Sequence, residues 1–151
     1  MKNLKKIKDE ELENLIEKDD PYALLEKGRR LLKEDDIKEA RKFLTFSSVL
    51  GNVDAHIALA KILEDEDNFE EAYDLYSLAY SKGDDAVLPK LARLIMINDK
   101  KLGLEVLKAN ANEGHIGCIK ELIKYYKESK SKDYEKEINY WQTRLNEDSE
   151  I

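Results

Sequence analysis

Residues 51–83 contain two helical patterns, in the sequence GNVDAHIALAKILEDEDNFEEAYDLYSLAYSKG. Apolar residues recur at intervals of four in each half, at Ala55, Leu59 and Leu63 and then at Ala72 and Tyr76. This spacing places side chains on one face of an α-helix, whereas a strand would alternate every second residue. The polar run at residues 65–68 separates the two patterns. We therefore predict two amphipathic helices joined by a short turn.

The same pattern recurs along the chain at a regular interval. Gly51, Gly83 and Gly114 are separated by 32 and 31 residues, and a helical pattern follows each of them. Counted from each glycine as position zero, position +8 is Leu59, Leu91 and Leu122. A fourth copy begins 32 residues upstream of Gly51, at Asp19, and has Gly28 at position +9. Hairpins of this size cannot bury a core alone, so recurring copies indicate a stacked solenoid.

The frame predicts an all-α fold, an α-solenoid of antiparallel helix pairs, in a single domain over residues 1–151. Nine helices are expected, at residues 8–18, 21–33, 36–50, 53–64, 68–82, 85–97, 99–113, 116–128 and 132–147. An N-terminal capping helix lies in residues 1–19, and the hairpin repeats follow at residues 20–51, 52–83, 84–114 and 115–147. Residues 148–151 are expected to form an acidic, solvated tail.

One hairpin carries small and large residues in an order that resembles the tetratricopeptide repeat signature: Leu59, Ala60, Leu63, Ala72, Tyr76 and Ala79. The 12-residue step from Ala60 to Ala72 is similar to that family's turn. The 20-residue step from Ala40 to Ala60, with a glycine before the next helix, resembles the Sel-one-like repeat family. The choice between the two families stays open. The resemblance implies a superhelix in which the first helix of each pair lines a concave groove.

Composition disfavours several classes of function. The 151 residues carry a formal net charge of −7, so a sequence-independent attraction to nucleic-acid phosphates or anionic lipid is not expected. The basic start of the chain is followed at once by Asp9, Glu10 and Glu11, where a secretion signal would need apolar residues. No apolar run approaches the roughly 18 residues of a membrane span. With one cysteine and hence no internal disulfide, we expect a cytoplasmic protein without nucleic-acid or membrane partners.

The residues that could carry chemistry are isolated from one another. His56 and His115 are the only histidines and occupy different repeat positions, so no metal site is predicted. Cys118 shares its position with Ala55 and is interpreted as a buried, inert thiol. Ser47 and its neighbour in sequence have no base beside them. We therefore expect neither a cofactor nor an enzyme.

One repeat position is basic in all four copies: position +10 is Arg29, Lys61, Arg93 and Lys124. It lies two residues from the core positions +8 and +12, so it points about 160° away from them on a helix. In a superhelix of the tetratricopeptide kind these side chains would form a cationic ladder along the groove. The positions that would flank the ladder include Tyr22, Leu25 and Met96. Outward positions are often basic, so a solvated face is the competing interpretation.

These features favour a non-catalytic scaffold or adaptor that holds a partner protein in the groove. Its ligand would be an acidic or C-terminal peptide segment, since the basic ladder complements carboxylates. The alternative is a small regulatory or neutralising protein of the same fold, such as a peptide receptor or an immunity-type inhibitor. The sequence leaves the partner's identity, the pathway and the oligomeric state open.

Overall fold

The computed structural model describes residues 3–149 and confirms the all-α prediction. Within these residues there are nine α-helices, three short 3₁₀ helices and no strand. In chain order the elements are η1 Leu4–Lys6, α1 Asp9–Ile16, α2 Pro21–Lys33, α3 Ile37–Val49, α4 Val53–Asp65, α5 Phe69–Ser81, η2 Asp85–Val87, α6 Leu88–Asn98, α7 Lys100–Asn112, α8 Ile116–Glu128, η3 Lys132–Tyr134 and α9 Glu135–Ser149.

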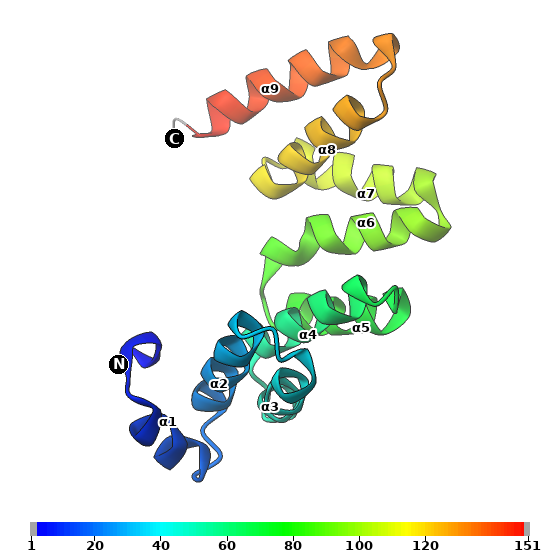
Figure 1. The fold of residues 1–151 in the computed structure, drawn as a ribbon. Coiled ribbons are helices and arrows are strands. Elements are labelled where there is room, and N and C mark those ends of the chain that lie inside the picture. Colours follow the sequence, from blue (N-terminus) through cyan, green and yellow to red (C-terminus); the bar gives the residue numbers. More distant parts are fainter. Residues whose placement is uncertain (1–2, 150–151) are drawn as a thin grey trace. The chain divides into compact units, whose positions relative to one another are not determined.

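The chain divides after Asp84 into two compact units. In the first unit α2 pairs with α3, and α4 pairs with α5 (Figure 1). Helix α3 also packs on α4, and α1 packs on α2. In the second unit α6 pairs with α7, α7 packs on α8, and α8 pairs with α9. Each unit is thus an array of helix hairpins in which sequence neighbours pack on one another, as in a helical-repeat solenoid.

The predicted core positions are buried in both units. Position +8 is 7 % exposed at Leu59, 7 % at Leu91 and fully buried at Leu122. Leu12 of α1, in the first unit, is 1 % exposed, and Trp141 of α9, in the second unit, is 3 % exposed. The prediction that these positions lie in the core is therefore confirmed.

The turns that precede each hairpin share one backbone conformation. The residue at position zero has a positive φ in all four copies, from 54° at Asp19 to 94° at Gly83. Glycine adopts this left-handed conformation without steric cost, and aspartate tolerates it better than most residues. Asp19 thus closes the same kind of turn as Gly83, which supports the fourth copy inferred from the sequence.

Side chains at the helix starts satisfy the first free amide groups. The Asp20 carboxylate accepts hydrogen bonds from the Tyr22 and Ala23 amides, each 2.9 Å long. Asn52 and Asp99 cap α4 and α7 in the same way. A polar residue at this position stabilises a helix by about 1 kcal/mol. The starts of these helices are therefore encoded locally.

Helix bounds depart from the predicted ones most at three helices. The first predicted helix, 8–18, is the shorter α1. The predicted helix 85–97 is split into η2 and α6, and the predicted helix 132–147 is split into η3 and α9. Helix α9 includes Asp148, whose carboxylate lies 3.9 Å from the Arg144 guanidinium. Part of the predicted tail is thus helical, and residues 150–151 lie outside the described residues. Within residues 3–149 every helix is too short or too polar to reach across a lipid bilayer.

Candidate functional site

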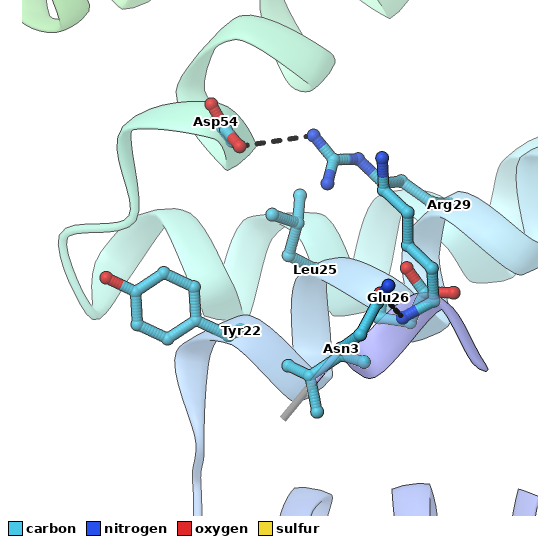
Figure 2. A pocket seen from close by; sticks show the side chains of 8 residues that line it. Asn3, Tyr22, Leu25, Glu26, Arg29 and Asp54 are labelled. Carbon is cyan, nitrogen blue, oxygen red and sulfur yellow. Dashed lines mark hydrogen bonds and ion pairs between the residues drawn. The ribbon is translucent and has the colours of Figure 1, made fainter. Parts of the chain in front are cut away.

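A pocket of about 320 Å³ in the first unit brings together three of the predicted groove residues, Tyr22, Leu25 and Arg29 (Figure 2). All three lie on α2, where positions three and four residues apart share a face. The other lining residues come from the N-terminal segment, from α2 itself and from the start of α4: Asn3, Leu4, Lys5, Glu26 and Asp54. The pocket therefore lies on the α2 face that also carries the first basic residue of the predicted ladder.

The Arg29 side chain forms an ion pair at the pocket edge. Its Nη2 lies 3.2 Å from Oδ2 of Asp54, and the two side chains are 40 % and 58 % exposed. Figure 2 shows this pair beside Leu25, with the Tyr22 ring on the other side of the leucine. A guanidinium has five N–H donors in a planar fork. Arg29 can therefore hold Asp54 and still donate to a second carboxylate.

Glu26 is the most buried charged residue of the pocket, with 7 % of the residue exposed. Its Oε1 accepts a hydrogen bond of 3.0 Å from Nε of Arg30, one helical turn away. Burial of an unpaired carboxylate would be costly, so this bond accounts for its position. The hydrogen bond to Glu26 raises the pKa of Arg30, with a further contribution from Asp9.

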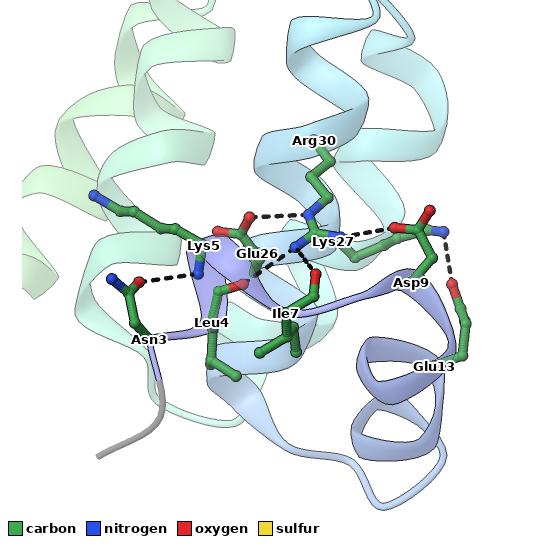
Figure 3. A network of polar contacts seen from close by, with 9 residues as sticks. All are labelled: Asn3, Leu4, Lys5, Ile7, Asp9, Glu13, Glu26, Lys27 and Arg30. Atoms are coloured by element: carbon green, nitrogen blue, oxygen red, sulfur yellow. Dashed lines mark hydrogen bonds and ion pairs between the residues drawn. The ribbon is translucent and has the colours of Figure 1, made fainter.

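Arg30 holds the N-terminal segment against α2 (Figure 3). Its Nη2 donates to the backbone carbonyls of Leu4, at 3.1 Å, and Ile7, at 2.9 Å. Its Nη1 donates to the Asp9 carboxylate at 2.7 Å. A second link between α1 and α2 is the ion pair of Lys27 with Glu13, 2.7 Å long. The segment that forms part of the pocket wall is thus tied to α2 by charge-assisted hydrogen bonds.

Two predicted groove residues have packing roles that the sequence analysis did not assign to them. Leu25 is only 3 % exposed and belongs to a core cluster formed by residues of α2, α3 and α4. It is buried because α2 packs on more than one neighbour, which widens its apolar face. Met96 packs on the second unit's core, and its Cγ fills the space that a Cβ on Gly103 would need. Leu25 thus borders the pocket from the core side, and Met96 lies inside its own hairpin.

The remaining ladder positions are divided between the units. Lys61, on α4 of the first unit, is exposed, as is Lys124 on α8 of the second unit. Arg93 on α6 is half-buried, and its Nη1 lies 3.9 Å from the Glu121 carboxylate on α8. Arg29 and Arg93 therefore both pair with an acidic residue of the first helix in the next hairpin. In each unit, one of the two basic ladder residues is thus paired with a carboxylate.

A serine and a histidine that are eight residues apart meet at the turn between α3 and α4. Oγ of Ser48 lies 2.6 Å from Nδ1 of His56, which is 2 % exposed. Burial lowers the pKa of His56, and the positive charge of Lys82 lowers it further. Among the described residues Nε2 of His56 has no hydrogen-bond partner. A nucleophilic pair needs an orienting group on that nitrogen, so the contact is interpreted as packing of a neutral histidine.

The other reactive side chains have structural surroundings. His115 caps α8, because its Nδ1 accepts from the Cys118 amide at 3.1 Å, while its Nε2 lies 3.0 Å from the Asp85 carbonyl oxygen. Cys118 is fully buried, and this burial raises the pKa of its thiol to about 11. Within residues 3–149 no three His, Cys, Asp or Glu side chains are grouped so that they could hold a metal ion.

Comparison of the chain with protein-family models, with curated proteins and with solved structures found no match.

Sequence reasoning missed the pocket residues that lie outside the repeat frame. Asn3, Leu4 and Lys5 precede the first copy, and no periodic pattern marks them. The only sequence feature that could have indicated them is Arg30, a basic residue at position +11. It follows the basic position +10 but lies on a different side of the helix. The tertiary contacts of Arg30 show which segment it binds.

Proposed function

We propose that this chain is a non-catalytic interaction module of tetratricopeptide-like or Sel-one-like kind. It binds a partner protein through a peptide carboxylate that enters the pocket of the first unit. The observation that carries the proposal is the convergence of Tyr22, Leu25 and Arg29 on one pocket of about 320 Å³. The pocket offers an aromatic ring, a leucine side chain and a cationic fork, which suits an acidic or C-terminal peptide segment.

The charges around the pocket support a carboxylate ligand. Glu26 already accepts a hydrogen bond from Arg30, and Asp54 pairs with Arg29. The donors left over are the free N–H groups of Arg29 and the Lys5 ammonium, which has no carboxylate within 4.0 Å among the described residues. A planar carboxylate fits the guanidinium fork in a bidentate manner. Arg29 and Lys5 therefore keep donors for a ligand carboxylate, while Glu26 and Asp54 keep unused acceptor sites.

The proposal is tested with a library of random displayed peptides that have free C-termini, selected on the full chain. We expect selected peptides to end in, or contain, acidic residues. Arg29→Met should weaken binding of a selected peptide by about tenfold, the effect of one charge-assisted contact. Raising the salt concentration should weaken binding to the unaltered chain, because the contacts are partly exposed.

A matched control is Arg41→Met, since Arg41 is also a half-buried arginine of the first unit and pairs with Glu66 outside the pocket. This variant should bind the selected peptide with unchanged affinity. Amidated and free forms of the same peptide show whether a terminal or a side-chain carboxylate is bound. Selection of peptides without any carboxylate preference, or equal loss in both variants, would contradict the proposal.

A further inference from the structure

The position of Arg30 is apolar or aromatic in the other three repeats. At position +11 the four copies carry Arg30, Ile62, Leu94 and Tyr125. Ile62 is 7 % exposed and belongs to a core cluster that includes residues of the preceding hairpin. In the first copy, the N-terminal segment lies against this side of α2. Polar contacts from Arg30 thus replace the apolar packing of the later repeats.

Residues 3–7, here called the N-terminal strap, are held mainly through their backbone. Arg30 donates to two strap carbonyls, those of Leu4 and Ile7, and to Asp9 just beyond the strap. The arginine side chain is only 22 % exposed, and its partner Glu26 only 9 %. Charge-assisted hydrogen bonds with limited exposure are among the stronger polar contacts in proteins. The strap is therefore held against α2 by hydrogen bonds from Arg30.

The strap contributes three lining residues to the pocket: Asn3, Leu4 and Lys5. The Asn3 side chain accepts a hydrogen bond from the Lys5 amide and so caps the short η1 helix, Leu4–Lys6. Lys5 is exposed, so its ammonium group can reach a ligand in the pocket. Without the strap, the pocket would keep only α2 and the start of α4 as its walls.

We propose that the strap is a built wall of the binding pocket, that Arg30 is the positioning residue that holds it, and that Lys5 supplies a second cationic contact to the ligand carboxylate. This inference rests on the proposed function and names the residues that complete the same site. A carboxylate bound by both Lys5 and Arg29 would contact two elements of the first unit, η1 and α2. The site therefore depends on a segment that precedes the repeats.

The test uses two measurements on the full chain. One measures attachment of the strap by trypsin cleavage within it, and the other measures peptide binding. Trypsin cleaves after Lys5 and Lys6 only when the strap leaves α2, so mass spectrometry of brief digests reports its attachment. Fluorescence polarisation with a labelled acidic peptide selected on the unaltered chain reports the site. Arg30→Met should increase cleavage within the strap at least tenfold and weaken peptide binding by about tenfold.

Three further variants separate positioning from folding. Arg30→Met with Glu26→Gln avoids a buried unpaired carboxylate and should reproduce both effects with a melting temperature close to that of the unaltered chain. Arg30→Lys keeps the charge but loses the fork, so it should recover only part of the protection. Lys5→Ala should weaken peptide binding several-fold while cleavage after Lys6 stays slow. The Arg41→Met control should change neither measurement.

The strap's role in the site, the role of Arg30 and the proposed function are each contradicted by a different outcome. If Arg30→Met frees the strap but binds the peptide with unchanged affinity, the strap is no part of the site and only the proposed function survives. Tighter binding in this variant would mean that the strap competes with the ligand, which contradicts the inference. An uncleaved strap in both Arg30→Met variants would show that Arg30 does not hold it. If the unaltered chain binds no carboxylate peptide, the proposed function fails and this inference fails with it.

Discussion

At the scale of single residues, His56 combines burial with a hydrogen bond to Ser48 and a positive neighbour, Lys82. Its pKa is lowered in the folded chain, first by burial and then by Lys82. As the pH falls below the ordinary value of about 6.5, the unfolded chain takes up this proton before the folded chain does. The free energy of unfolding should therefore decrease between pH 7.5 and the lowered pKa.

Urea denaturation at pH 7.5 and pH 5.5 measures this effect. In His56→Gln the contribution of His56 disappears, so the loss of stability between the two pH values should be smaller than in the unaltered chain. Ser48→Ala keeps the histidine and should retain the pH dependence. An equal loss in the His56→Gln variant would mean that another group titrates.

At the scale of a helix, α4 places a core residue and a surface residue two positions apart. Leu59 is 7 % exposed and belongs to a core cluster, whereas Lys61 is exposed. Leu59→Ala should lower the free energy of unfolding by about 2 to 5 kcal/mol through lost burial and a cavity. Lys61→Ala should change it by no more than about 0.5 kcal/mol. Chemical denaturation monitored by circular dichroism compares the two, and similar losses would refute the helix register.

At the scale of the whole molecule, stability is expected to be local, because each hairpin contacts mainly its sequence neighbours. Leu59→Ala should speed hydrogen exchange chiefly in the first unit, residues 1–84, and Leu122→Ala chiefly in residues 85–151. Hydrogen exchange followed by mass spectrometry gives the protection of each unit in both variants. Uniform loss of protection across both units in either variant would instead indicate one cooperative structure.

Short-range periodicity in the sequence predicted the all-α fold class and the repeated core position +8, but it placed Leu25 beside the groove, whereas Leu25 is buried in the core. A four-residue apolar spacing dictates which helix face is buried, and Leu59, Leu91 and Leu122 are all buried as predicted. A positive φ at Gly51, Gly83 and Gly114 likewise follows from local steric freedom. These properties depend on residues that are close together in the chain.

Which polar residues contact one another depends on tertiary packing. Arg30 binds carbonyls more than twenty residues away, and Arg29 reaches Asp54 across a hairpin. Ser48 and His56 are brought together by the turn between two helices. Helical periodicity predicts which side chains point away from the core. The partner of each such side chain depends on how the neighbouring helices and the N-terminal strap pack. The pocket therefore became visible only in three dimensions, because its walls come from segments with no shared sequence pattern.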